Sequence, residues 1–284
     1  MTVFSIGRKP ARPYASFAAA WGNGRLDGVR IGVLREYMSR KLFAKADEES
    51  IDIIERAIDD IRKLGATIVD PGPDKELFKD CLARYAPRLM NSAFARQYPQ
   101  LFGADLIAKS RFYTDPNFPD RKQARERDEG ATVLDTSVRL QGRFAMQTML
   151  LQCMQEQRLD ALVSPMSTVP PRKLTSPREP AVNGRTPIGW SLIGQQGFPA
   201  ITVPAGFTTA VWDRVAGGND GARLVGPVPA SLPVGVDFIA LPFGEPLLFR
   251  IASAYEAATR HRRPPPDFGP VEAPATRKVP KVIQ

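Results

Sequence analysis

A strand, an amphipathic helix and a second strand follow one another near the start of the chain. "VRIGVL" (29–34) is apolar and β-branched, as is typical of a buried strand. "KADEESIDIIERAIDDIRKLG" (45–65) places isoleucines at helical spacing, which predicts one apolar helix face made of Ile51, Ile54, Ile58 and Ile61. "ATIVD" (66–70) is the second strand. This order predicts a βαβ unit with parallel strands and a right-handed crossover, and therefore an α/β protein.

Later segments predict further elements. A helical pattern runs from about residue 132 to residue 157, and "ALV" (161–163) is a short strand that breaks at Pro165. Residues 208–231 are glycine-rich and predict a connection or a hairpin. "VGVDFIAL" (234–241) is a strand, and the helix after it has an apolar face made of Leu247, Leu248, Ile251 and Tyr255. We expect one domain over residues 1–266 and a Pro-rich tail over residues 267–284.

The net charge of +9 raises the question of nucleic-acid binding, because Lys and Arg side chains that neutralise phosphates drive such binding. Residues 121–130 mix both signs, however, and the basic cluster "RHRRPPP" (260–266) is short. Recognition-helix and zinc-finger spacings are missing from the sequence. We therefore expect a solvated basic surface and no nucleic-acid partner. No apolar run approaches the roughly 20 residues that a membrane span needs, so we expect no membrane partner either.

Cysteine and histidine are scarce. Cys81 and Cys153 lie in apolar, helical segments, which favours buried and unreactive thiols. Two cysteines fall far short of a disulfide framework, and the first residues lack the order of a secretory signal, so we expect a cytoplasmic protein. The sole histidine, His261, lies in the basic cluster, where we expect it to be solvated. The sequence holds no cluster of metal-ligating residue types, so we expect no metal and no cofactor.

Three segments share their order with one enzyme family. They are "DALVSPMSTVPP" (160–171), "GFPAITVPAGF" (197–207) and "LPVGVDFIALPFGEPLLFRIASAYEAAT" (232–259). Together they resemble the C-terminal half of the amidase signature enzymes, the hydrolases and amidotransferase subunits that cleave amide carbon–nitrogen bonds. "LDGVRIGVLREYM" (26–38) and "LGATIVD" (64–70) look like the segment that follows the signature region of that family. The resemblance extends from about residue 8 to residue 265.

The resemblance implies an α/β fold with a mixed β-sheet flanked by helices, here incomplete, and hydrolysis of a small-molecule amide. Family members use a serine nucleophile, a second serine in a cis peptide and a lysine that accepts the proton through the bridging serine, with no histidine or metal. Those residues lie in a glycine- and serine-rich signature. This chain has no adjacent serines and no glycine-serine cluster, so we assign it no catalytic residue and expect the isolated chain to be inactive.

What the resemblance leaves to this chain is part of a pocket wall. The loop "SPMSTVPP" (164–171) and the turn "GQQGFP" (194–199) would approach the acyl part of the substrate. The substrate-binding candidates are Ser164, Met166, Ser167, Gln195 and Gln196. The alternative places Met166 in the core and uses both glutamines to satisfy the turn backbone. Gly194 departs from the family pattern, in which asparagine is frequent, and this departure removes one side-chain amide.

Three functions remain open. In the first, the chain is the C-terminal portion of an amide hydrolase, and its partner is a missing N-terminal half or a second copy of the chain. In the second, it is a non-catalytic amidase-like protein that binds a ligand or a partner. The third is a basic nucleic-acid-binding module. Aggregation of the chain alone would favour the first, a cooperatively unfolding monomer the second, and salt-dependent DNA retention the third.

Overall fold

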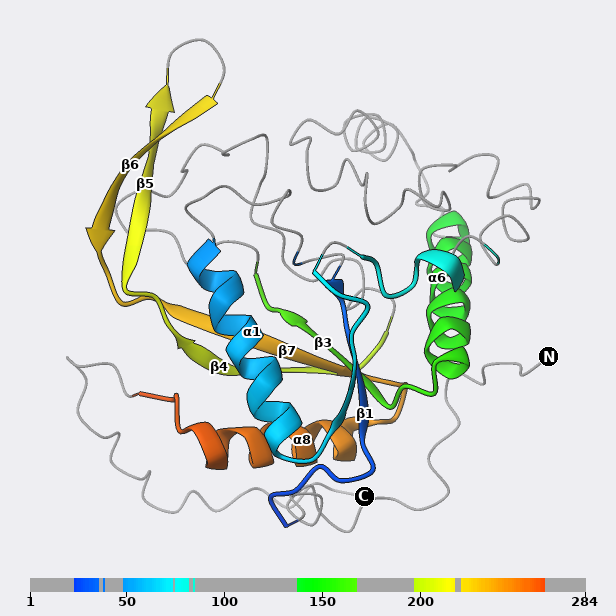
Figure 1. Cartoon of the computed structure of the whole chain (residues 1–284). Helices are drawn as coiled ribbons and strands as arrows, with labels where there is room; N and C mark the ends of the chain where they lie inside the picture. Colours follow the sequence, from blue (N-terminus) through cyan, green and yellow to red (C-terminus); the bar gives the residue numbers. More distant parts are fainter. Residues whose placement is uncertain are drawn as a thin grey trace, which may run out of the picture.

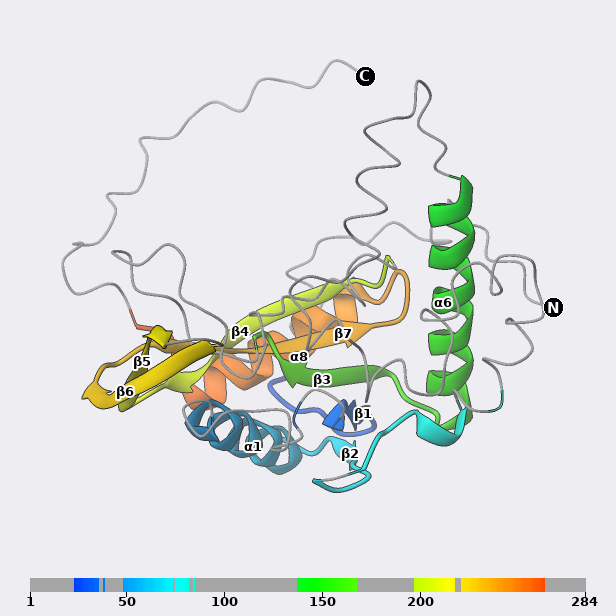
Figure 2. The same ribbon diagram turned by 90° about the horizontal axis from the view of Figure 1, so that it is seen from above.

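The computed structural model describes residues 23–35, 38, 48–73, 75–81, 84, 137–167, 197–217 and 221–263. Its main sheet has five strands in the order β2-β1-β3-β7-β4 (Figures 1 and 2). The strands are β1 (Arg30–Val33), β2 (Thr67–Val69), β3 (Ala161–Pro165), β4 (Ala200–Phe207) and β7 (Pro233–Ala240). β1 pairs in parallel with β2 and β3, and β7 pairs antiparallel with β3 and β4. The predicted mixed sheet flanked by helices is confirmed.

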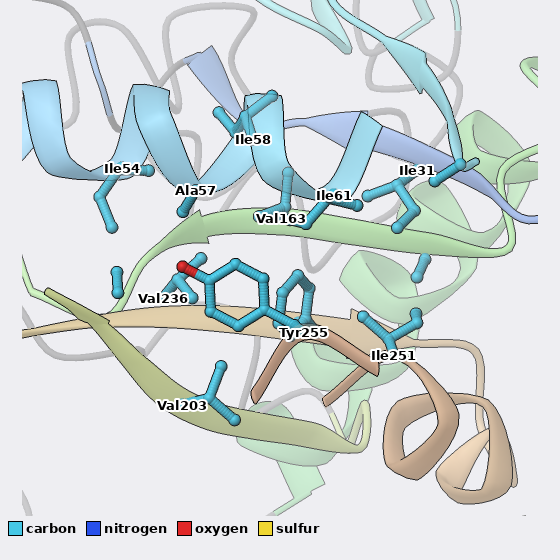
Figure 3. Close-up of a cluster of buried hydrophobic side chains, with 14 of the residues drawn as sticks. Ile31, Ile54, Ala57, Ile58, Ile61, Val163, Val203, Val236, Ile251 and Tyr255 are labelled. Carbon is cyan, nitrogen blue, oxygen red and sulfur yellow. The ribbon is translucent and has the colours of Figure 1, made fainter. Parts of the chain in front are cut away.

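Two helices, α1 (Glu48–Lys63) and α8 (Glu245–Thr259), pack on one face of this sheet (Figures 1 and 2). The predicted apolar face of α1 is confirmed, since its isoleucines are 0–2% exposed. α8 buries Leu248, Ile251 and Tyr255 as predicted, while Leu247 is only partly buried. Figure 3 shows side chains from both helices and from the strands meeting in one apolar layer. Each such side chain contributes about 1.5–3 kcal/mol when buried, so this layer is the main source of stability.

Both ends of α1 in the βαβ unit agree with the sequence prediction. Glu48 and Glu49 occupy the first turn of α1, and Arg62 and Lys63 occupy the last, so the charges complement the helix dipole. Gly65 follows with a φ of +103°, a conformation that L side chains rarely adopt. Thr67 in β2 then pairs with Arg30 in β1. The turn from α1 into β2 therefore uses glycine at the position where the backbone needs a positive φ.

The helix α6 (Ser137–Glu156) lies at the end of the sheet farthest from β5 and β6 (Figure 2). A disulfide joins it to the segment that contains Cys81. Cys153 bonds to Cys81 across 72 residues of sequence, with their Cα atoms 5.6 Å apart. Both cysteines are buried, as predicted, but the prediction of two unreactive thiols is wrong. Sequence spacing did not reveal the bond because two cysteines pair only when tertiary packing brings their Cα atoms within reach. Residues 132–136 of the predicted helix lie outside the described residues.

Residues 208–231 form a hairpin, which was one of the two predicted forms. β5 (Ala210–Gly217) and β6 (Gly221–Pro229) pair antiparallel and prolong β4 and β7 into a ribbon that projects away from the helices (Figures 1 and 2). Thr208 fixes the junction, because its hydroxyl donates to the Ala230 carbonyl and accepts from the Leu232 N–H. The described residues end at residue 263, so the predicted boundary at residue 266 and the tail over residues 267–284 lie outside them.

The strand β3 includes Pro165 and ends there, so it is two residues longer than the predicted strand over residues 161–163. Pro165 pairs with Val236 of β7, and Met166 donates its N–H to the Gly235 carbonyl at 3.0 Å. The alternation of an antiparallel ladder therefore turns the Pro165 nitrogen away from β7, toward the side where pairing with β1 has already ended at Val163. A proline is tolerated there because no ladder hydrogen bond is lost.

Candidate functional site

A row of polar side chains crosses the sheet on the face opposite to α1 and α8. Ser164 of β3 pairs with Asp237 of β7, and Asp237 pairs with Thr202 of β4, so the three side chains project from the same face. The Thr202 hydroxyl donates a short hydrogen bond to the Asp237 carboxylate. The Ser164 hydroxyl donates to the Pro165 carbonyl at 3.1 Å. We call these three residues the polar row.

The absence of a side chain at Gly235 brings two flanking residues together over β7. A Cβ atom at Gly235 would lie 2.9 Å from the Thr202 Cγ2 atom and 3.1 Å from the Met166 Cβ atom. Real Cβ contacts under 3.0 Å essentially never occur, so only glycine permits this approach. Met166 is 45% exposed and Thr202 is also exposed, while Ser164 and Asp237 are buried at 0% and 2% exposure. The row is therefore a buried polar floor with an exposed edge.

Burial controls the protonation of Asp237. Removal from water raises the pKa of this carboxyl group to about 6, although the hydrogen bond from Thr202 acts in the opposite direction. Asp237 is therefore a carboxyl group that gains and loses its proton near neutral pH. A carboxyl group of this kind can donate or accept a proton between Ser164 and Thr202 on this face of the sheet.

Three of the five predicted binding residues lie in the described part of the chain. Ser164 belongs to the buried floor, and Met166 lies at its exposed edge, so the alternative that placed Met166 in the core is wrong. Ser167 is half-buried directly after Met166. Gln195 and Gln196, together with Gly194, lie outside the described residues.

The sequence interpretation missed Thr202 and Asp237. Each is a polar residue between two apolar ones in a strand: Thr202 follows Ile201, and Asp237 follows Val236. A single polar residue within an otherwise apolar strand segment was the signal that could have identified them. Their adjacency could not have been found in this way, because it depends on the pairing of β4 with β7.

A charged cluster joins α1 to the segments that follow β1 and β2. Arg35 follows β1 and is 5% exposed; its guanidinium binds the Asp70 carboxylate, with a 2.8 Å contact from Nε to Oδ1, and the Glu55 carboxylate. The hydrogen bond from Arg35 lowers the pKa of Asp70 below its ordinary value, against the effect of partial burial. Because Glu55 belongs to α1 and Asp70 follows β2, this cluster clamps the helix to the ends of the first two strands.

Other catalytic arrangements find no support in the described part of the chain. The two cysteines bond to each other, so neither is available as a thiolate nucleophile. No three His, Cys, Asp or Glu side chains gather there as metal ligands would. His261 is half-buried with its ring 6.3 Å from that of Tyr255, so it is less solvated than the sequence predicts. None of the helices drawn as ribbons is both long and apolar enough to cross a membrane.

Comparison with known proteins identifies relatives of about twice this length. A glutamyl-tRNA(Gln) amidotransferase chain of Myxococcus xanthus (strain DK1622) is 29% identical over 245 residues, which cover 81% of this chain and 45% of that protein. Its counterpart of the same name from Pseudomonas fluorescens (strain Pf0-1) is 26% identical over 275 residues, covering 90% of this chain and 50% of that protein. The chain thus spans about half the length of the curated relatives it matches.

Solved structures share the fold over a similar extent. The native peptide amidase from Stenotrophomonas maltophilia superposes with a TM-score of 0.50 at 22% identity, covering 91% of this chain and 48% of that chain. The structure of PAM12A gives a TM-score of 0.51 at 21% identity, with 91% and 49% covered. At these identities the likeness concerns the fold alone. The Amidase family model matches residues 7–249, which is most of the sequence, and on that evidence this chain belongs to the amidase family.

Proposed function

We propose that this chain forms one wall of the active-site cleft of an amide hydrolase, and that the residues that attack the amide come from a segment outside these 284 residues. The observation that carries the proposal is the match of the Amidase family model to residues 7–249. The length of the relatives supports it, since the matched regions correspond to only 45–50% of those proteins. The substrate is a small-molecule amide, and the reaction is hydrolysis of its carbon–nitrogen bond.

The polar row supplies the location of the cleft in this proposal. Met166 and Thr202 are exposed at its edge and contact the acyl part of the substrate, while Ser164 and Asp237 support them from below. Ser167 follows Met166 at this edge, and Gln195 and Gln196 remain binding candidates outside the described residues. On the opposite face, the apolar side chains of α1 and α8 pack against the strands.

Serine chemistry would divide between two segments. The family pattern requires a serine nucleophile, a bridging serine and a lysine, and none of these is assigned in this chain. A neutral lysine removes the proton of the nucleophile through the bridging hydroxyl, and backbone N–H groups stabilise the oxyanion. The part played by this chain is to position the acyl group beside that machinery, which contributes to the rate through orientation.

An assay of reconstituted activity tests the proposal. We expect the chain alone to leave an aryl amide such as a nitroanilide unhydrolysed, and to become active when combined with the glycine- and serine-rich segment encoded upstream of it. A serine-reactive fluorophosphonate should then label that segment and not this chain. Enzymatic hydrolysis by the chain alone would refute the division of labour. An inactive mixture, with a chain that unfolds cooperatively as a monomer and binds amides, would instead identify a non-catalytic binding protein.

The variant Thr202→Val sharpens the assay. It removes the hydroxyl that binds Asp237 and keeps the size of the side chain. In the reconstituted enzyme we expect KM for the amide to rise severalfold, because both the exposed edge and its buried support are altered. The matched control is Thr148→Val on α6, whose hydroxyl donates to the Phe144 carbonyl of its own helix. An equal effect of both variants would show that the polar row is not part of the cleft.

The cytoplasm is the compartment we propose. The Cys81–Cys153 bond makes the proposal testable, because cytosolic thiols are normally kept reduced and a disulfide is unusual there. Cell fractionation should recover the chain from the cytosol. Alkylation of free thiols in the intact cells before lysis then reports whether Cys81 and Cys153 are reduced or bonded there. Recovery of the protein only from an oxidising compartment would overturn this part of the proposal.

A further inference from the structure

A pocket of about 380 Å³ lies on the helical face of the sheet, away from the polar row. Its walls come from the middle of α1, from the end of β4 and the junction with the β5–β6 ribbon, and from the segment that follows α8. Ile53, Arg56 and Asp60 of α1 line it at a spacing of three and four residues, so they project from one side of the helix. The volume falls in the range that small-molecule sites occupy.

Basic side chains dominate the charge of this pocket. Arg56 and Arg263 both line it, and they come from segments more than 200 residues apart in sequence. Asp60 is the acidic residue of the lining, and its carboxylate already binds the Lys63 ammonium group at 2.8 Å. His261 adds an imidazole beside the arginines. Two guanidinium groups thus face one carboxylate that is neutralised by another partner.

Arg263 is positioned by an aromatic ring. Its Cζ atom lies 5.0 Å from the ring centroid of Phe207, over the ring face. A guanidinium stacked in this way uses its flat face for the ring and keeps its N–H groups for an anion. Phe207, which is half-buried, also gives the pocket an apolar surface next to the charge.

The wall beside Arg263 is held in place by hydrogen bonds. The Thr208 hydroxyl joins the two strands of the ribbon junction, and the Glu49 carboxylate accepts from the N–H and the hydroxyl of Thr209 at 2.8 and 2.7 Å. Glu49 is thereby directed to the backbone of the junction and does not line the pocket. Ser231 adds an exposed hydroxyl to the lining. The junction at this wall is therefore held by hydrogen bonds, and the Phe207 ring positions Arg263 beside it.

We propose that this pocket binds a small molecule that carries a carboxylate or phosphate group on a compact apolar body. The oxyanion lies between Arg56 and Arg263, where charge-assisted hydrogen bonds are available, with Ser231 as a further donor. The apolar body packs against Phe207. This site is separate from the proposed amide cleft, because it lies on the other face of the sheet, and its occupancy does not depend on amide hydrolysis.

The sole histidine of the chain is a built-in reporter for the test. In a titration at constant pH and ionic strength, the ring resonances of His261 are followed by NMR while inorganic phosphate, phenyl phosphate, benzoate or benzyl alcohol is added. We expect saturable shifts with the three anions, tighter binding of the two aromatic anions than of phosphate, and no saturable shift with the neutral alcohol. A stronger response to phenyl phosphate than to benzoate would assign phosphate esters as the natural class, and the reverse would assign carboxylates.

Arginine variants locate the binding. Arg56→Gln and Arg263→Gln should each weaken the binding of phenyl phosphate by roughly tenfold, since each removes one charge-assisted contact. The control Arg223→Gln changes an exposed arginine on β6, outside the pocket, and should have no effect. The proposal is overturned if the wild-type protein shows no saturable shift, if benzyl alcohol binds as tightly as the anions, or if Arg223→Gln weakens binding as much as the pocket variants do.

Discussion

The two faces of the main sheet differ in composition although they belong to the same strands: one is packed with apolar side chains, and the other carries polar groups. The face under α1 and α8 is sealed by isoleucines and by Tyr255, which is fully buried among them. The opposite face carries a buried carboxyl group, two hydroxyl groups and an exposed methionine. Alternation along each strand assigns one set of residues to stability and the other to a site. The difference teaches that one short strand can serve both purposes at once.

Truncation on the sealed face should have the largest effect. Ile58→Ala removes a side chain that is 1% exposed, and we expect the free energy of unfolding to fall by about 2–5 kcal/mol because a cavity remains. Chemical denaturation followed by circular dichroism measures the change. Arg56→Ala, on the exposed side of the same helix, is the control and should change stability by about 0.5 kcal/mol or less. Equal losses for both variants would break the contrast between the faces.

Removal of the disulfide should show how much the bond between α6 and the Cys81 segment stabilises the protein. Replacement of both Cys81 and Cys153 by serine should lower the free energy of unfolding by about 2–4 kcal/mol, since the bond closes a long loop in the unfolded chain. Denaturation with and without dithiothreitol measures the effect in the wild-type protein. The double variant should be insensitive to the reductant. A wild-type midpoint that reductant leaves unchanged would contradict the expected role.

Asp237 should reverse the usual pH dependence of a carboxyl group. Because its pKa is raised to about 6 in the folded chain, its contribution is fully present below the ordinary value near 3.8 and is lost as the pH rises through about 6. We expect Asp237→Asn to stabilise the protein by about 2 kcal/mol at pH 8 relative to its effect at pH 4. The measurement compares variant and wild type by denaturation across this range. A stability difference that stays constant with pH would show that the carboxyl group is not desolvated.

The smallest effect is expected where the sealed face meets the ribbon. Glu49→Gln weakens the contacts that its carboxylate makes with Thr209 and Ala210 and should cost about 1 kcal/mol or less. Hydrogen exchange at the two amides is the sensitive readout and should accelerate severalfold. Glu48→Gln, one residue earlier in α1, is the matched control. Unchanged exchange in Glu49→Gln would show that the junction is held by Thr208 alone.

The sequence predicts what depends on periodicity and fails where pairing decides. Ile51, Ile54, Ile58 and Ile61 repeat at helical spacing, so the packed face of α1 follows from local pattern alone. The polar row does not, because Thr202 and Asp237 become neighbours only when β4 pairs with β7. The bond between Cys81 and Cys153 was missed for the same reason. The predicted strand over residues 161–163 stopped short of Pro165 because the tolerance of a proline depends on which side of β3 lacks a partner.

The Cys81–Cys153 bond also changes what a single cut of the backbone can do. It makes a covalent ring of the residues between the two cysteines, and that ring includes most of α6. One proteolytic nick anywhere inside the ring leaves a single molecule on a non-reducing gel, and two fragments separate only after reduction. A protease can therefore open the segment between the two cysteines without releasing either piece.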